Sequence, residues 1–258
     1  MTARRRAALA VAVLLAATAT GAAHAQWHDS NDRVEMRILD RDAYDELPQY
    51  LYRGQAWVPG TPGHRYAVQL VNRSPARVLV VLSVDGVNAV TGQTASSNQA
   101  GYVLEPYATT EVAGWRKSMR DVAQFYFSDI GDSYAARTGR AANVGVIGIA
   151  VFDEARRVPQ PRVYLPERPA ADAAAAPPMA QSRAQEIGTG HGEREYAPVS
   201  RTGFLRASSR PVQVTEIRYD DAYALAQRGI GPSRYGRRDR GEPRALPGGF
   251  VPDPPRGW

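Results

Sequence analysis

Hydrophobic positions in the first half of the chain recur mainly at every second residue. Val34–Ile38 alternates apolar with charged side chains, which is the pattern of a strand with one buried face. Val78–Val84 is apolar on both faces, as in a central strand, and Asp85-Gly86 then supplies a pair that tolerates the positive φ of a tight hairpin. About nine or ten short strands are expected in this half. The pattern predicts an all-β fold, an immunoglobulin-like antiparallel β-sandwich or a barrel.

Composition divides the chain after residue 154. Residues 26–154 carry 12 basic and 15 acidic side chains with five prolines, whereas residues 155–258 carry 17 basic and 11 acidic side chains with 14 prolines. In the second segment, alternation predicts strands at 202–206 and 212–219, followed by a short helix that Gly229 ends. We therefore expect four units: a β-sandwich domain (26–165), an Ala/Pro-rich linker (166–186), a small β/α appendage docked on the sandwich (187–230) and a disordered Arg/Gly/Pro-rich tail (231–258).

The first 25 residues have the three parts of a secretory signal peptide. Three arginines, Arg4–Arg6, precede 11 apolar residues, Ala7–Ala17, and small residues follow at Ala23 and Ala25. An apolar run of this length is well short of the ~20 residues that span a bilayer. The sequence predicts a signal peptide at 1–25, cleavage between Ala25 and Gln26, and an exported protein, periplasmic or secreted, without a membrane span.

Several chemistries are excluded by composition. The chain has no cysteine, which removes disulfides, thiolate catalysis and Cys-ligated metal sites. The glycines of Gly188–Gly192 resemble a phosphate-binding loop, but no strand pattern precedes them and no helix pattern follows, so we expect a flexible glycine loop. No catalytic residue, cofactor or metal ion is assigned from motifs.

Two places could still carry function. Trp115, Arg116 and Lys117 combine an aromatic ring with two cations, and Lys117 is the only lysine in the chain. Such a group can stack on sugars or bind anions, which makes it the candidate partner-binding site. In the alternative interpretation Trp115 fills the core and the two cations are solvated. His191 is the only histidine of the second segment and the candidate acid–base group.

Longer motifs suggest a family. The chain resembles a family of uncharacterised exported proteins of Gram-negative bacteria, for which no reaction, ligand or catalytic residue is established. The resemblance implies shared architecture and export only. It rests on Pro62–Tyr66, Val78–Asn88, Gly114–Ser118, Asp132–Gly139, Asn143–Gly148 and Gly188–Gly192.

Two functions from different classes follow. The first is an exported, non-enzymatic β-sandwich that binds a protein or an anionic glycan of the cell envelope. The alternative is a periplasmic hydrolase that uses carboxylates and His191 as a base. Nucleic acid is not an expected partner, because the export signal directs the protein away from it. Peripheral contact with a membrane surface could come from the arginines of the tail: Arg234, Arg237, Arg238, Arg240, Arg244 and Arg256.

Overall fold

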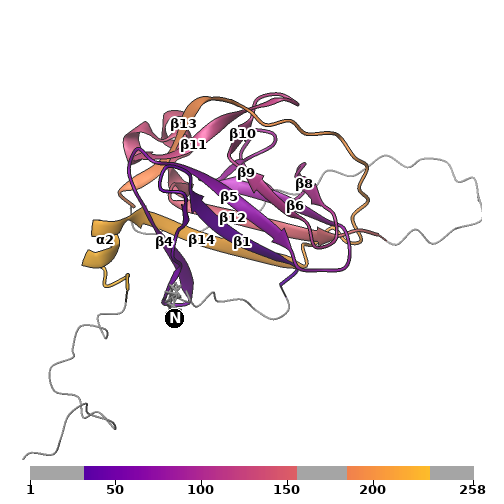
Figure 1. Ribbon diagram of the computed structural model, residues 1–258, viewed down its shortest axis with the longest axis horizontal. Coiled ribbons are helices and arrows are strands. Elements are labelled where there is room, and N and C mark those ends of the chain that lie inside the picture. Colours follow the sequence, from indigo (N-terminus) through magenta and orange to yellow (C-terminus); the bar gives the residue numbers. More distant parts are fainter. Residues whose placement is uncertain (1–31, 156–184, 233–258) are drawn as a thin grey trace, which may run out of the picture.

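The computed structural model describes residues 32–155 and 185–232, which form two seven-stranded sheets packed face to face (Figure 1). The all-β sandwich predicted from the sequence is confirmed. The first sheet contains β1 (Val34–Asp40), β2 (Asp45–Glu46), β5 (Arg65–Asn72), β9 (Thr109–Val112), β10 (Gly114–Arg116), β11 (Asp121–Asp129) and β13 (Ile187–Tyr196). The second contains β3 (Tyr50–Tyr52), β4 (Gln55–Gly60), β6 (Val78–Val84), β7 (Val87–Asn88), β8 (Tyr102–Leu104), β12 (Val146–Asp153) and β14 (Gln213–Asp221).

Four short helical segments complete the described part of the chain. Three lie between β11 and β12 and one follows β14. They are the 3₁₀ turn Ile130–Asp132, α1 (Tyr134–Arg137), the 3₁₀ turn Ala141–Asn143 and α2 (Ala222–Gln227). None of the helices in the described ranges has the length and apolar character needed to cross a bilayer.

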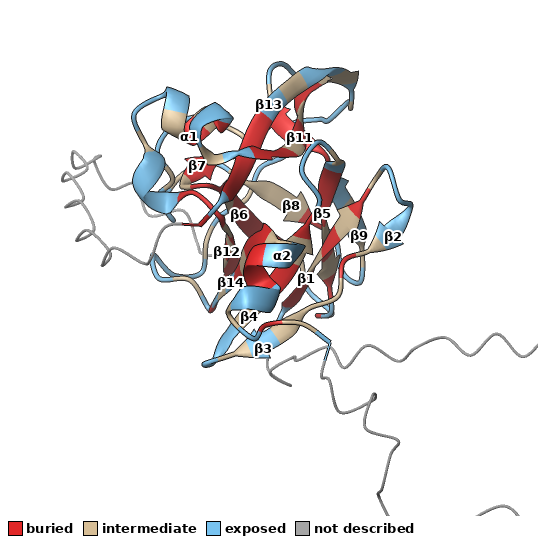
Figure 2. Ribbon diagram, turned by 90° about the vertical axis from the view of Figure 1, so that its left-hand side faces the viewer, coloured by how far each residue is buried: buried red, intermediate tan, exposed pale blue. Residues whose placement is uncertain are grey.

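The core lies between the two sheets. Inward-facing side chains of β1 and β5 meet those of β6 and β12, and Figure 2 shows these strands buried at the centre of the molecule. Val78–Val84 is buried at six of its seven positions, which confirms the prediction of a central strand. The largest fully buried side chains are aromatic: Tyr66, Tyr219, Phe125, Phe127 and Phe152.

The second segment of the chain is part of both sheets. β13 pairs with β11 in one sheet, and β14 lies between β4 and β12 in the other, parallel to β4 and antiparallel to β12 (Figure 1). The expected appendage at 187–230 therefore differs from the structure, because its strands complete the sandwich and only α2 is an addition to it. The physical reason lies in the backbone of β4, which pairs with β3 along one edge. Its other edge would carry unpaired N–H and C=O groups, and β14 pairs with them.

Turn chemistry agrees with the hairpin predicted at Asp85-Gly86. Asp85 and Gly86 have φ values of 52° and 71°, and they join β6 to β7. Arg53 and Gly54, with φ values of 51° and 75°, join β3 to β4 in the same way.

One predicted strand is wrong, and one helix is confirmed. Thr202–Arg206 forms only an isolated bridge between Glu154 and Arg206. Its backbone pairing is limited to the Ala155 N–H on the Leu205 carbonyl at 2.7 Å and the Ala207 N–H on the Asp153 carbonyl at 2.9 Å, which is too short for a strand. The Arg206 guanidinium lies over the Phe152 ring at 4.0 Å. The short helix α2 is capped by Asp221, whose carboxylate accepts the Ala224 N–H.

Three further predictions concern residues outside the described ranges. They are the signal peptide with its cleavage between Ala25 and Gln26, the linker up to residue 184, and the tail from residue 233.

Candidate functional site

The indole of Trp115 is a core side chain. It is 2% exposed, lies edge-on to the Phe125 ring at 4.8 Å and packs on Tyr134 at 4.9 Å. A ring enclosed in this way has no free face for a sugar. The structure thus agrees with the alternative interpretation of this tryptophan.

The two cations beside Trp115 lie in different surroundings. Arg116 is half-buried and donates through Nη1 to the carbonyl oxygen of Ala197. Lys117 is exposed. Of the three candidate binding residues, only Lys117 offers its charged group freely to solvent.

His191 lies at the same end of the molecule as Trp115. Its ring is stacked on the indole of Trp115 at 6.3 Å and tilted against Tyr134 at 5.4 Å. Partial burial lowers the pKa of His191, and the positive charge of Lys117 lowers it further. Within the described ranges no carboxylate hydrogen-bonds to this imidazole, so the pairing that would orient a general base is not formed there.

The glycines around His191 belong to a strand, so the expectation of a flexible loop is wrong. Gly188, Gly190 and Gly192 all lie in β13. A Cβ on Gly190 would lie 2.1 Å from Cζ of Tyr126, and one on Gly188 would lie 2.6 Å from Cβ of Ser133. Glycine is required because neighbouring side chains occupy the space over the strand.

This packing gives a testable prediction for Gly190→Ala. The new methyl group must displace the Tyr126 ring, so the free energy of unfolding should fall by about 1–3 kcal/mol in urea denaturation. The matched control is Gly203→Ala, since nothing lies within 4 Å of a Cβ there. In the double variant with Tyr126→Ala, the cost of Gly190→Ala should largely disappear; an unchanged cost would contradict the clash.

A polar network lies inside the sandwich around Asp85, which is fully buried. Its Oδ1 accepts hydrogen bonds from the Tyr219 hydroxyl at 2.7 Å and the Gly145 N–H at 2.9 Å, and its Oδ2 accepts one from the Thr189 N–H at 2.7 Å. The Thr189 hydroxyl in turn bonds to the hydroxyls of Tyr66 at 2.5 Å and Tyr219 at 2.7 Å. One carboxylate therefore ties the β6–β7 turn to both strands of the second segment.

Burial dominates the electrostatics of this network. It raises the pKa of Asp85 to about 6. The hydrogen bonds from Tyr219, Thr189 and Gly145 lower this pKa and so offset part of the rise. The pKa values of Tyr66 and Tyr219 are also raised well above the usual range, first by burial and second by the negative charge of Asp85. Since every one of these groups is closed off from solvent, we assign the network to stability.

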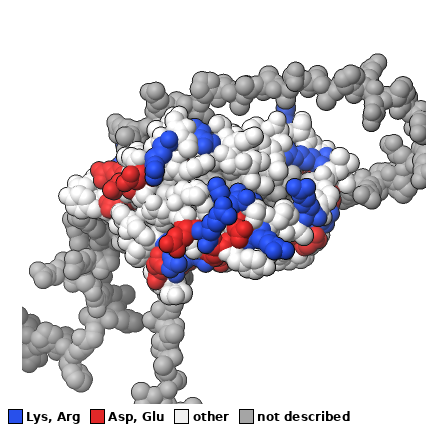
Figure 3. Space-filling view, turned by 90° about the horizontal axis from the view of Figure 1, so that it is seen from above, with Lys and Arg blue, Asp and Glu red and all other residues white. Residues whose placement is uncertain are grey.

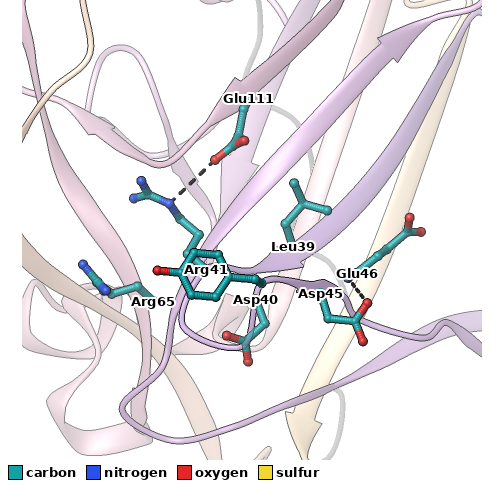
Figure 4. Close-up of a pocket in the computed structure, with 8 residues that line it drawn as sticks. Leu39, Asp40, Arg41, Asp45, Glu46, Arg65 and Glu111 are labelled. Carbon is teal, nitrogen blue, oxygen red and sulfur yellow. Dashed lines mark hydrogen bonds and ion pairs between the residues drawn. The ribbon is translucent and has the colours of Figure 1, made fainter.

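One surface pocket has a volume of about 500 Å³ and surrounds the β1–β2 turn (Figure 4). Most of its charged side chains are paired. Arg41 binds Glu195 with Nη1 to Oε2 at 2.5 Å and lies 3.7 Å from Glu111, and Asp40 binds His64 with Oδ2 to Nδ1 at 2.8 Å. Figure 3 shows the same mixing on the face seen from above, where basic and acidic side chains lie side by side. A ligand here would have to compete with these ion pairs.

The second pocket, of about 440 Å³, lies where α2 and the β3–β4 hairpin meet β14. Its residues, called here the arginine pocket, are Tyr52, Arg53, Gln55, Trp57, Arg218, Gln227, Arg228 and Ile230. Trp57 packs with Leu225 and Ile230, so it forms a fixed wall. The lining combines Tyr52, Trp57 and Ile230 with two amide and three guanidinium side chains.

Three arginines surround the aromatic rings of this pocket. The guanidinium carbons of Arg218 and Arg228 lie 5.9 and 5.7 Å from the Trp57 ring centroid, and that of Arg53 lies 5.2 Å from the Tyr52 ring centroid. No acidic side chain is among the described lining residues. Nη2 of Arg228 lies 2.9 Å from Oδ2 of the buried Asp220. Three arginines and no described acidic side chain thus line the pocket.

Sequence reasoning missed the arginine pocket. It joins the hairpin at Arg53 to Arg218 and Arg228, and their proximity depends on the insertion of β14 beside β4. Periodicity predicts both strands but says nothing about which strands are neighbours. The one local signal was Arg53-Gly54, a turn that presents a cation.

Fold and pocket together define a class: an all-β sandwich with a basic, aromatic-lined pocket on one sheet. The chain matches no known protein-family model, no curated protein and no solved structure.

Proposed function

We propose that this protein is an exported, non-enzymatic binding protein for an anionic glycan of the cell envelope, which it holds in the arginine pocket. The observation that carries the proposal is the combination of three arginines and two aromatic rings around one cavity without an acidic lining residue. Export is supported by the signal sequence at 1–25.

The arginines argue for an anion. A guanidinium group offers a planar fork of donors that fits carboxylate and phosphate oxygens. Two of the three arginines in the pocket are half-buried, so their interactions are screened less by water than those of exposed side chains. The buried Asp220 holds Arg228 in place, which lowers the entropy lost when a ligand binds.

The aromatic rings argue for a sugar. The half-buried Tyr52 ring lines the pocket beside Trp57, of which 8% is exposed, and an aromatic ring beside polar groups suits a sugar, which has both C–H and hydroxyl surfaces. Gln55 and Gln227 add amide donors and acceptors for hydroxyl groups.

The test is titration with galacturonate, a sugar that carries one carboxylate, against galactose as the neutral sugar. A ligand of this size should bind with a Kd of about 1 mM, and galactose should bind at least about tenfold more weakly, because it lacks the charged group. The change in tryptophan fluorescence and isothermal titration calorimetry both measure this difference.

Variants locate the binding. Arg218→Gln should weaken galacturonate binding about tenfold or more, and so should Arg53→Asn, in which asparagine tolerates the positive φ of the turn. The control, Arg210→Gln, removes an exposed arginine outside the pocket and should leave the affinity unchanged. Equal affinity for the two sugars, or an equal effect of all three substitutions, would refute the proposal.

A further inference from the structure

Each arginine of the arginine pocket comes from a different element of the fold. Arg53 lies in the β3–β4 turn with a φ of 51°, Arg218 lies in β14, and Arg228 directly follows α2. Arg218 is opposite Trp57 in the parallel pairing of β14 with β4, and Figure 2 shows α2 beside these two strands. The three guanidinium groups therefore reach the cavity from three separate parts of the structure.

A carboxylate uses this arrangement only in part. It has two oxygens in one plane, and a single guanidinium fork can bind both of them. A phosphate monoester has three terminal oxygens that point in different directions, so it can accept hydrogen bonds from several guanidinium groups at once. Three arginines on separate elements thus match a phosphate group more closely than a carboxylate.

The charge of the lining favours the same group. Three guanidinium groups and no acidic side chain of the described residues line the cavity, and Asp220, which contacts Arg228, is fully buried outside that lining. A phosphate monoester carries about −1.5 to −2 charges at pH 7, whereas a carboxylate carries a single charge. Because the Coulomb energy is proportional to the charge of the ligand, the phosphate gains more in this pocket.

From these observations we infer that the anionic group held in the arginine pocket is a phosphate monoester on a sugar ring, and that this ring lies beside Tyr52 and the amides of Gln55 and Gln227. The inference rests on the proposed function of the pocket and adds the chemical class of the ligand, a phosphorylated glycan unit. A cavity of about 440 Å³ is large enough for a hexose phosphate.

The experiment compares five ligands on the full chain by isothermal titration calorimetry: galactose 6-phosphate, galactose 6-sulfate, galacturonate, glycerol 3-phosphate and inorganic phosphate. Galactose 6-phosphate should bind at least about tenfold more tightly than galacturonate. The sulfate ester has three terminal oxygens but a single charge, so it should bind more weakly than the phosphate ester. Glycerol 3-phosphate and inorganic phosphate lack the sugar ring and should also bind more weakly.

A double variant locates the phosphate. Arg53→Asn combined with Arg218→Gln leaves Arg228 as the one arginine of the described lining. Because one fork binds either ligand through two oxygens, the preference for galactose 6-phosphate over galacturonate should fall below about threefold. The control Arg210→Gln, outside the pocket, should keep the full preference. A preference that is unchanged in the double variant would place the phosphate elsewhere and overturn the inference.

The outcomes separate the two proposals. If galacturonate or galactose 6-sulfate binds as tightly as galactose 6-phosphate, the assignment to a phosphate is overturned and the pocket proposal stands. If inorganic phosphate, or glycerol 3-phosphate as the polar part of a phospholipid, binds as tightly as galactose 6-phosphate, the sugar ring takes no part and the inference is again overturned. If none of the anionic sugars binds the native protein, the pocket proposal itself fails.

Discussion

Asp85→Ala should lower the free energy of unfolding by about 3–5 kcal/mol, a large part of the total stability of a single domain. The substitution leaves three buried donors, on Tyr219, Thr189 and Gly145, without an acceptor. It also places alanine at a φ of 52°, a backbone conformation that aspartate and asparagine adopt more readily than alanine. Urea denaturation at pH 7, followed by circular dichroism, measures the change.

The same carboxyl group should give stability an unusual pH dependence. Its pKa is about 6 in the folded protein against an ordinary value of 3.8, so between these values the folded state holds a proton that the unfolded state releases. The folded state binds more protons, and the contribution of Asp85 to stability therefore falls as pH rises, by up to about 3 kcal/mol between about pH 4 and pH 6. Above pH 6 this contribution is constant.

Asp85→Asn is the matched control. It keeps a side chain suited to the positive φ and an oxygen that can accept from Tyr219 and Gly145, but it does not titrate. The free energy of unfolding of the native protein minus that of Asp85→Asn should fall as pH rises from 4 to 6. A difference that is constant over this range, or that grows, would show that Asp85 is not a buried group with a raised pKa.

Local patterns accounted for most of the fold. Alternation at Val34–Ile38, the apolar run Val78–Val84 and the pair Asp85-Gly86 each determine a structure through interactions within a few residues. The role of Val212–Tyr219 was harder to predict. Its alternation indicates a strand, but its place between β4 and β12 depends on contacts with residues far away in sequence.

The prediction of the binding site from the sequence failed for a related reason. Trp115 beside two cations has the same composition as Trp57 beside Arg218 and Arg228, yet only the second group surrounds a cavity. Both indoles are buried, with 2% and 8% exposed, so the difference lies in the packing around them, which follows from which face of a strand points inward and what packs there. Asp85 was interpreted as a hairpin residue, correctly, but its bonds to strands 100 residues away could not be predicted from the turn.

Trp115→Ala should cost about 3–5 kcal/mol of stability, because it opens a cavity among Phe125, Tyr134 and neighbouring core residues. Thermal denaturation of the full chain should show a cooperative transition at a clearly lower Tm. Trp115→Phe should cost less, since it keeps an aromatic ring, and Nε1 of Trp115 donates to no acceptor among the described residues.

Ligand affinity distinguishes a tryptophan that packs in the core from one that contacts the ligand. At a temperature where the Trp115→Ala protein is still folded, its affinity for galacturonate should equal that of the native protein, because Trp115 does not line the arginine pocket. Lys117→Ala should change neither stability nor this affinity, since its side chain is exposed away from the core. If Trp115→Ala instead kept its Tm and lost galacturonate binding, the ligand would lie at Trp115–Lys117 and the arginine pocket would be the wrong site.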